Sequence, residues 1–378
     1  MKCAFFSYFC RCKISEIDCK TGKILNLMMK EDEKYMQRCL DLAALGAGSV
    51  SPNPMVGAVI VCNGEIIGQG WHKKYGEAHA EVNAVASVCD KSLFAQSTIY
   101  VSLEPCSHWG KTPPCAELLV RCGFKRCVIA NRDPNPKVNG RGIDILKASG
   151  MEVECGVLAE QAWYLNRAFF TRQLLHRPYI ILKYASSCDG FISPEQQGDY
   201  WLSNEPMQVW VHRLRSETDA IMAGYHTVEK DNPRLNVRKY FGTNPIRLTI
   251  DRNLSLDKNL CFFDHSQRTV VFNHLCDKSE DNLEYVHIMP ERSEAEQVVE
   301  WLYRHEASTL VVEGGRSLLN KFIDSGLWDE IDRIDTPCSI GCGTPAPEIQ
   351  AQADETITIG NNTLCRFFNR SGILFKSE

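Results

Sequence analysis

Long apolar runs, an excess of positive charge and a dinucleotide-binding fingerprint are all missing from this sequence. No stretch reaches the roughly 18 consecutive apolar residues that a membrane-spanning helix needs, so we expect no membrane partner. The formal net charge is −5, with both signs interspersed. A nucleic-acid backbone is bound by clustered lysine and arginine, so we expect no nucleic-acid partner. No GxGxxG motif occurs, and a Rossmann fold is therefore not supported. These absences favour chemistry on small molecules.

Cysteine is abundant, but the 18 cysteines lack the short, regular spacing of a small secreted disulfide scaffold. We therefore predict reduced thiols, most of them buried, in a cytoplasmic protein. The first 30 residues are basic and rich in cysteine, yet they have neither the apolar core nor the cleavage site of a secretory signal. We predict that residues 1–30 form a poorly ordered N-terminal extension. An upstream start codon, with Met28 or Met29 as the true start, and a weak targeting peptide are left open as alternatives.

The composition is that of a globular protein with more than one domain. Of the 378 residues, 44% are hydrophobic and 24% are charged, which is enough apolar material for a sizeable core. No internal repeat and no low-complexity tract is present. At about 150 residues per domain, we predict one domain over residues 31–172 and a second over residues 173–378.

Helical and strand signals alternate from the start of the first domain. Apolar residues at helical spacing, followed by glycines, predict a helix over residues 33–47. Asn63 and Gly64 tolerate the positive φ angles of a type I′ turn. They therefore predict a hairpin between the strands 55–61 and 65–71.

The same alternation continues through the rest of the first domain and into the second. Strands are predicted over residues 97–103 and 126–131, separated by a helix that prolines open and a glycine closes. Residues 158–176 are predicted to form a single connecting helix. Further buried strands begin at Arg177, and the strand "STLVVEGG" ends in glycines at residues 314–315. Alternating strands and helices favour an α/β architecture in both domains.

Three residues of the first domain form a metal-ligand pattern. His79 and Glu81 lie in "GEAHAEV", and Cys106 and Cys115 lie in "LEPCSHWGKTPPC". A hydrolytic zinc site uses three nitrogen or sulfur ligands and keeps a fourth position for water. The histidine and the two cysteines would be these ligands, and zinc would make hydroxide available from that water at neutral pH. Glu81 would carry the proton from the water to the departing nitrogen.

Cys115 also stands where a thiolate is favoured. It follows Pro113 and Pro114 at a predicted helix start, at the positive end of the helix dipole. Taken singly, each residue of the pattern is at least as often an ordinary histidine or thiol as a metal ligand. Together they resemble the HxE and PCxxC signature of zinc-dependent nucleobase deaminases, although eight residues separate Cys106 from Cys115. A structural zinc site with a fourth protein ligand, and iron in place of zinc, are the alternatives.

Longer motifs carry a more specific resemblance. The chain resembles the bifunctional diaminohydroxyphosphoribosylaminopyrimidine deaminase and 5-amino-6-(5-phosphoribosylamino)uracil reductase of riboflavin biosynthesis, from about Glu33 to Ser325. The motifs of the first domain are "SPNPMVGAVIV", "GWHKKYGEAHAEV", "LEPCSHWGKTPPC" and "DPNPKVNGRG". Those of the second domain are "RPYIILKYASSCDGFIS", "HRLRSETDAIMAG", "TVEKDNPRLNVR" and "LVVEGG". The resemblance implies an α/β protein in which a cytidine-deaminase-like three-layer domain precedes a dihydrofolate-reductase-like α/β domain.

The resemblance implies two reactions on one small molecule. A zinc-dependent pyrimidine deaminase, a hydrolase, would remove ammonia from 2,5-diamino-6-(5-phosphoribosylamino)pyrimidin-4-one. An oxidoreductase would then use NADPH to reduce the ribosyl group of the product to ribityl. Asn53 and His72 would contact the pyrimidine, although physical chemistry alone makes Asn53 a turn residue and His72 a half-exposed histidine at a strand end. Zn2+ and NADPH would be the cofactors, and homo-oligomerisation is left open.

The second domain would hold NADPH and the ribosyl phosphate. Its "VVEGG" strand runs into glycines and a helix start, where a phosphate can approach the backbone, although such a turn alone is a weak indication. The resemblance implies cofactor contacts by Ala185, Trp201, Thr227, Asp231 and Gly315. It implies substrate contacts by Arg215, Leu235, Arg238 and Glu313. An arginine suits this task because it can hold a phosphate through two hydrogen bonds. Lys183 is a further candidate, for polarising the opened sugar.

The second domain also departs from the family pattern. Asp199 replaces serine, Cys188 replaces the more usual leucine, and residues 331–345 match only loosely. A carboxylate at position 199 would repel a nearby phosphate. A deaminase with a degenerate reductase domain is therefore the main alternative function, and a structural-zinc binding module is a less favoured one.

Overall fold

The computed structural model describes residues 30–109, 113–135, 138–195 and 202–371. Residues 1–29 of the predicted extension, together with Asp199 and Trp201, lie outside them. Contacts divide the chain into two compact units. Of the described residues, the first unit contains those from Lys30 to Val50 and from Pro54 to Asn166, and the second contains Ser51–Asn53 and those from Arg167 to Ser371.

The first unit is built on a five-stranded mixed sheet. Its strands are β1 Gly57–Cys62, β2 Glu65–Trp71, β3 Thr98–Leu103, β4 Arg126–Asn131 and β5 Glu152–Cys155. Its helices are α1 Glu31–Ala43, α2 Ala80–Ser87, α3 Cys115–Cys122, α4 Arg141–Ala148 and α5 Ala159–Leu165, with short 3-10 helices η2 Ala44–Gly46 and η3 Lys91–Gln96. The strand order is β2-β1-β3-β4-β5, with β1 antiparallel to its neighbours and β3, β4 and β5 parallel.

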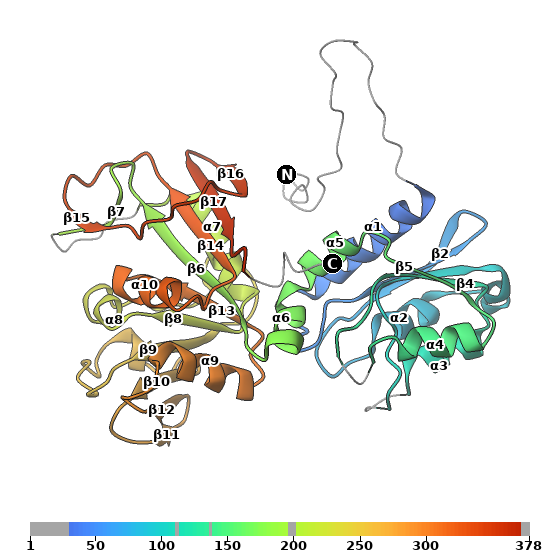
Figure 1. Ribbon diagram of the computed structural model, residues 1–378, viewed down its shortest axis with the longest axis horizontal. Coiled ribbons are helices and arrows are strands. Elements are labelled where there is room, and N and C mark those ends of the chain that lie inside the picture. The colour runs from blue at the N-terminus through green and yellow to red at the C-terminus, as the bar shows by residue number, and fades with distance from the viewer. Residues whose placement is uncertain (1–29, 110–112, 136–137, 196–201, 372–378) are drawn as a thin grey trace, which may run out of the picture. The chain divides into compact units, whose positions relative to one another are not determined.

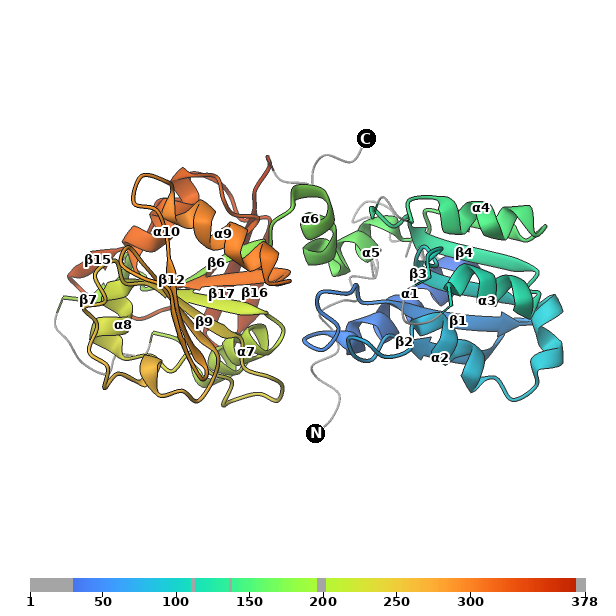
Figure 2. The same ribbon diagram turned by 90° about the horizontal axis from the view of Figure 1, so that it is seen from below.

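Two hydrophobic cores lie on opposite faces of this sheet. Successive residues of a strand point to opposite faces. Ile60 and Ile99 accordingly pack with α2, α3 and α4, whereas Val59 and Tyr100 pack with α1 and α5. Figures 1 and 2 show the two helical layers on either side of the strands. The predicted three-layer architecture of the first domain is confirmed.

Local sequence signals set the ends of several elements. Asn63 and Gly64 have φ angles of 51° and 81°, as a type I′ turn requires, and they join β1 to β2 as predicted. Gly123 ends α3 with a φ of 72°, a left-handed conformation that glycine adopts without strain.

The prediction of one helix over residues 158–176 is wrong. The structure has two helices, α5 and α6 (Arg167–Leu175), which are separated at Asn166. Asn166 is buried. Its side chain accepts a hydrogen bond from the backbone N–H of Met55 and donates one to the carbonyl oxygen of Met55, each 2.8 Å long. Helical periodicity does not reveal this break, because its partner lies 111 residues away in the chain.

The second unit contains a ten-stranded sheet and a separate two-stranded sheet. The strands are β6 Tyr179–Ser186, β7 Phe191–Pro194, β8 Ala220–Ala223, β9 Ile246–Ile250, β10 Thr269–Asn273, β11 Lys278–Glu280, β12 Leu283–His287, β13 Thr309–Glu313, β14 Glu330–Asp335, β15 Gly343–Pro345, β16 Glu355–Ile359 and β17 Asn362–Phe368. The other helices are α7 Glu205–Ser216, α8 Tyr225–Asp231, α9 Glu294–Arg304, α10 Arg316–Asp324 and the 3-10 helix η4 Cys261–Phe263. The order of the large sheet is β11-β12-β10-β9-β8-β13-β6-β14-β17-β16, and β15 pairs with β7.

The central strands of the large sheet are parallel. They run from β12 through β10, β9, β8, β13 and β6 to β14. Helices α9 and α10 pack on one face, and α7 and α8 pack on the other (Figure 2). The carboxyl ends of parallel strands meet at one edge, where open α/β sheets bind their ligands. Residues 331–345, which match the family loosely in sequence, still supply most of β14 and all of β15.

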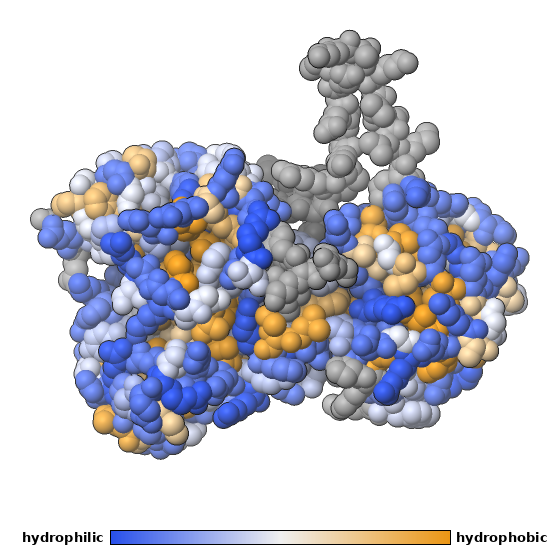
Figure 3. All heavy atoms as spheres, in the orientation of Figure 1, coloured by the Kyte–Doolittle hydropathy of each residue, from blue (hydrophilic) through white to orange (hydrophobic). Residues whose placement is uncertain are grey.

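The described cysteines and the visible surface can be compared with the predictions from composition. The 14 cysteines within the described ranges are all free, but only five of them are buried. The prediction that most thiols are buried is therefore wrong. Figure 3 shows hydrophilic residues over most of the visible face of each unit, with smaller hydrophobic areas between them. Across the described ranges, every helix is too short or too polar to span a membrane.

Candidate active sites

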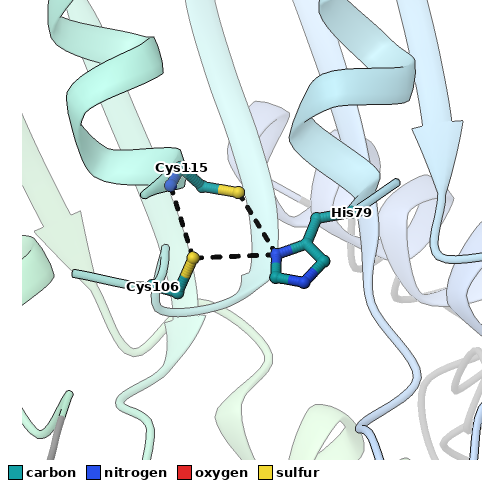
Figure 4. Close-up of side chains that lie close together, drawn as sticks. All are labelled: His79, Cys106 and Cys115. Carbon is teal, nitrogen blue, oxygen red and sulfur yellow. Dashed lines mark hydrogen bonds between the residues drawn. The ribbon is translucent and has the colours of Figure 1, made fainter. Parts of the chain in front are cut away.

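The side chains of His79, Cys106 and Cys115 converge in the first unit (Figure 4). Nδ1 of His79 lies 3.4 Å from Sγ of Cys115 and 3.6 Å from Sγ of Cys106. The three candidate ligand atoms lie within 4.8 Å of one another. Among the described residues, no other group of three His, Cys, Asp or Glu side chains is placed to hold a metal ion. One nitrogen and two sulfurs are donors that zinc prefers, so the cluster fits this ion.

Two helix starts and one loop position these ligands. His79 is the N-cap of α2, and Cys115 is the first residue of α3. Cys106 lies in the loop after β3. Its Sγ accepts a hydrogen bond of 3.3 Å from the backbone N–H of Cys115, and its carbonyl oxygen accepts one of 3.1 Å from the N–H of Ala116. These N–H groups are available because the first turn of a helix lacks intrahelical acceptors.

The two thiols differ in acidity. Hydrogen bonds with the Cys115 thiol and the His79 ring lower the pKa of Cys106 to about 4. The pKa of Cys115 is raised, first by its hydrogen bond to Cys106 and then by burial. The Cys106 thiol is thus the more acidic of the two, whereas the thiolate expected for Cys115 as a metal ligand stays a prediction. A metal would hold both residues as thiolates.

Glu81 lies next to the ligands, in the first turn of α2, and is 3% exposed. Burial, together with the negative charge of Cys106, raises its pKa to about 7. A carboxyl group with a pKa near neutrality can both accept and release a proton at physiological pH. Glu81 thus has the acidity that the predicted proton-transfer role requires.

His72 and Asn53, the two residues predicted to contact the pyrimidine, lie in different surroundings. The ring of His72 lies edge-on to that of His79, with 5.6 Å between centroids. His72 is buried rather than half-exposed, with Nδ1 3.1 Å from the carbonyl oxygen of Ala78. Asn53 is half-buried in the turn that follows Pro52, in the short segment that clusters with the second unit. Both substrate contacts stay predictions.

A second constellation of charged side chains lies in the second unit. Glu313, the last residue of β13, is opposite Lys183 of β6 in the strand register. Nε and Nη2 of Arg215, from α7, donate hydrogen bonds of 3.1 and 2.8 Å to the Glu313 carboxylate. Nζ of Lys183 lies 3.6 Å from the same carboxylate. Burial opposes ionisation of Glu313, but the charges of Arg215 and Lys183 outweigh it and lower its pKa to about 2. Burial lowers the pKa of Lys183, and Glu313 partly offsets this.

Arg238 is linked to this group through Asn236 and His212. Nη1 of Arg238 donates to Oδ1 of Asn236 at 3.0 Å, and Nη1 of Arg215 donates to the carbonyl oxygen of Asn236 at 3.3 Å. The backbone N–H of Arg238 donates to Nδ1 of His212 at 3.2 Å. Burial and the positive charges of Arg215 and Arg238 lower the pKa of His212 to about 4. His212 is therefore neutral at physiological pH, and because Nδ1 is an acceptor, its proton is on Nε2.

The glycine turn after β13 adjoins α8. Gly314 and Gly315 have φ angles of 82° and 63°, and they precede α10. A Cβ atom on Gly314 would lie 3.0 Å from Cγ2 of Thr227, so a side chain here would crowd that residue. A glycine turn at a helix start suits a phosphate group. Of the other predicted cofactor and substrate residues, Ala185 is half-buried on β6, Asp231 is exposed at the end of α8, Leu235 is buried, and Trp201 lies outside the described residues.

Family models match both units. The cytidine and deoxycytidylate deaminase zinc-binding region matches residues 29–131, and the RibD C-terminal domain matches residues 178–363. The riboflavin biosynthesis protein RibD of Synechocystis sp. is 37% identical over 325 residues, which cover 84% of this chain and 88% of that protein. The chain belongs to the RibD family. The RibD of Bacillus amyloliquefaciens is also 37% identical, over 84% of this chain and 87% of its own length.

Solved RibD structures share the fold of this RibD-family chain. The diaminohydroxyphosphoribosylaminopyrimidine deaminase/5-amino-6-(5-phosphoribosylamino)uracil reductase of Thermotoga maritima has a TM-score of 0.82 and 32% identity, covering 89% of this chain and 98% of that one. RibD of Acinetobacter baumannii has a TM-score of 0.80 and 30% identity over the same shares. The chain thus has the RibD order of a deaminase domain and then a reductase domain, and it is a bifunctional enzyme of riboflavin biosynthesis. The family resemblance seen in the sequence is confirmed.

Two buried polar residues near these sites were not predicted from the sequence. His212 lies three residues before Arg215 on α7, and this spacing alone indicates that the two side chains share a face. Glu104 directly follows the apolar strand β3 and is 3% exposed. An acid that interrupts a buried apolar segment is a signal, because unpaired carboxylates are rarely buried.

Proposed function

We propose that this chain removes an amino group from a phosphoribosylamino-pyrimidine with the help of zinc, and then reduces the ribosyl group of the product with NADPH. The proposed substrate is 2,5-diamino-6-(5-phosphoribosylamino)pyrimidin-4-one. One observation carries the deaminase half: an imidazole and two thiols converge beside a buried carboxyl group whose pKa is about 7. The named activity of the Thermotoga maritima relative supports the choice of substrate.

The ligand cluster and Glu81 divide the deaminase chemistry between them. His79, Cys106 and Cys115 would hold the zinc ion. When bound, zinc supplies a water that loses a proton near neutral pH. Glu81 would accept that proton and donate it to the nitrogen that leaves as ammonia, and its burial keeps bulk water away from the carboxyl group. The described residues contribute three ligands instead of four, which favours a hydrolytic site over a structural zinc site.

The reductase half would use the carboxyl edge of the large sheet. Lys183, Arg215 and Arg238 are three cations around the single carboxylate of Glu313, so a positive charge remains to attract the ribosyl phosphate. Because Arg215 already donates two hydrogen bonds to Glu313, we assign direct phosphate contact to the exposed Arg238. Lys183 would hold the carbonyl oxygen of the opened sugar.

The glycine turn and α8 would receive the nicotinamide cofactor. Gly315, at the start of α10, and Thr227, beside it, would approach the phosphates of NADPH. Ala185, Trp201 and Asp231 are the other proposed cofactor contacts. When bound, NADPH supplies the hydride, and the protein orients it towards the sugar.

Separate measurement of the two products tests this proposal. Purified full-length protein would be given the diamino-pyrimidine phosphate with and without NADPH, while ammonia release and NADPH absorbance are followed independently. We expect ammonia in both reactions and loss of NADPH absorbance in the second. Ammonia without NADPH oxidation would support the deaminase with a degenerate reductase domain. If the protein released no ammonia and oxidised no NADPH, the proposed function would be contradicted.

The remaining assignments follow from this function. We propose that the deaminase domain spans residues 31–172 and the reductase domain residues 173–378. The proposed partners are small molecules, without nucleic acid or membrane, and the proposed location is the cytoplasm. Homo-oligomerisation is left open.

A further inference from the structure

Glu104 is a buried acid that the proposed chemistry does not use. It is the first residue after β3 and is 3% exposed. Cys106, a proposed zinc ligand, follows it after a single proline. A carboxylate is costly to bury unless its oxygens are hydrogen-bonded. The partners of Glu104 therefore indicate what it does.

Four backbone N–H groups hold the Glu104 carboxylate. Oε2 accepts hydrogen bonds from Asp133 at 3.2 Å and from Gly140 at 3.0 Å. Oε1 accepts hydrogen bonds from Gly142 at 2.9 Å and from Ile143 at 3.2 Å. Three of these donors are the N-cap and first-turn residues of α4, whose own N-cap residue has no side-chain hydrogen bond. Glu104 thus caps, from another element, N–H groups that a helix start leaves without partners.

The backbones of the Cys106 loop and of α4 are also in close contact. A Cβ atom on Gly142 would lie 2.1 Å from the carbonyl oxygen of Pro105, so this position has no room for a side chain. The backbone N–H of Glu104 donates to the carbonyl oxygen of Asn131, at the end of β4, at 2.9 Å. The loop that carries Cys106, the end of β4 and the start of α4 therefore meet at Glu104.

We propose that Glu104 is a positioning residue for the metal centre, which it serves by fixing the Cys106 loop against α4. The inference rests on the proposed zinc-dependent deaminase. Both carboxylate oxygens are held, so the Glu104 side chain has little freedom to rotate, and the backbone passes from it through Pro105 to Cys106. Sγ of Cys106 must lie near the N–H of Cys115 and Nδ1 of His79 to complete the ligand set. Loosening Glu104 would separate the ligands without changing any of them.

Substitution Glu104→Gln in the full-length protein tests this role. In this variant an amide NH2 group replaces one of the two carboxylate oxygens. It cannot accept hydrogen bonds, so the two backbone N–H groups that donate to that oxygen lose their partner. We expect zinc affinity, measured by competition with a chromogenic chelator, to fall at least about tenfold. The visible spectrum of the cobalt-substituted protein should also change, while kcat and KM of the reductase should not. Zinc affinity and the cobalt spectrum test the role of Glu104 without any substrate. The proposed function is tested separately, because it would fail if the wild-type protein released no ammonia.

Two further variants keep the test decisive. Asp144→Asn removes the same charge from an exposed position in the first turn of α4 and should leave zinc affinity unchanged. Glu104→Asp keeps both acceptor oxygens on a shorter side chain and should bind zinc with intermediate affinity. Wild-type zinc affinity and an unchanged cobalt spectrum in Glu104→Gln would overturn the proposal. If Glu104→Gln does not fold, the same two measurements on Glu104→Asp decide, and wild-type values there overturn it.

Discussion

The guanidinium group of Arg215 donates two hydrogen bonds to the carboxylate of Glu313, from Nε at 3.1 Å and from Nη2 at 2.8 Å. Lys183 approaches the same carboxylate to 3.6 Å, and all three side chains are at most 14% exposed. Two largely buried cations therefore share one anion. The carboxylate stabilises both of them, and a positive charge is left over for an anionic ligand.

Substitution Glu313→Gln should destabilise the second unit. The amide keeps the shape of the carboxylate but leaves Arg215 and Lys183 without a counter-charge, and breaking a buried ion pair in this way costs about 3 kcal/mol. We expect the free energy of unfolding from urea to fall by about that amount. Glu300→Gln is the matched control, because Glu300 pairs with Arg292 on the surface, where such pairs contribute less than about 1 kcal/mol. Equal stability of the two variants would contradict a buried pair that depends on its charge.

Substitution Glu81→Gln should abolish deamination but leave the fold and the zinc site intact. The amide cannot transfer the proton, and loss of a general acid–base group lowers kcat by at least about 100-fold. Ammonia release measures this loss, and metal analysis checks that zinc is retained. Glu77→Gln, at an exposed position two residues before His79, should release ammonia at the wild-type rate. Wild-type deamination by Glu81→Gln would remove Glu81 from the mechanism.

Removal of the metal should separate the two activities. The ligand cluster belongs to the first unit, whereas Lys183, Arg215 and Glu313 belong to the second and include none of the ligands. A strong chelator should therefore stop ammonia release, and added zinc should restore it. NADPH oxidation with the deaminated intermediate as substrate should continue throughout. Ammonia release that persists in protein shown to be free of metal would rule out the proposed role of zinc.

Features that depend on neighbouring residues could be predicted from the sequence. The hairpin at Asn63 and Gly64 follows from their tolerance of positive φ angles. Glu81 falls in the first turn of α2, and Cys115 opens α3, as the flanking residues indicate. Most of the metal site is local in this sense, because each ligand lies at or near the end of a strand or helix that its own segment specifies.

Features that depend on distant residues could not be predicted. Arg215 and Glu313 are 98 residues apart, and the family resemblance implies a substrate contact for each but not that they bind each other. The break between α5 and α6 lies at Asn166, whose side chain is hydrogen-bonded to the distant Met55. The low pKa of Cys106 likewise follows from its hydrogen bonds with Cys115 and His79. Such pairings are set by how strands and helices pack, which short motifs do not encode.

His212 gives the second unit a stability that depends on pH. It is 3% exposed and has a pKa of about 4, lowered by burial and by the positive charges of Arg215 and Arg238, whereas its pKa in the unfolded chain is about 6.5. Between these two values the unfolded chain binds a proton that the folded chain does not. The free energy of unfolding therefore falls as the pH falls through this window. The stabilisation is complete above about pH 6.5 and is lost towards pH 4, by roughly 3 kcal/mol in total.

The variant His212→Gln should lack this pH dependence. Its amide oxygen can still accept the hydrogen bond from the backbone N–H of Arg238, but it does not titrate. Between about pH 7 and pH 5, the free energy of unfolding from urea should fall by about 2 kcal/mol more in the wild type than in the variant. Other titrating groups are present in both proteins, so their contributions cancel in this difference. If the two proteins lost stability in parallel over this range, His212 would have to be readily protonated in the folded state, and its neutral role beside Arg215 and Arg238 would be excluded.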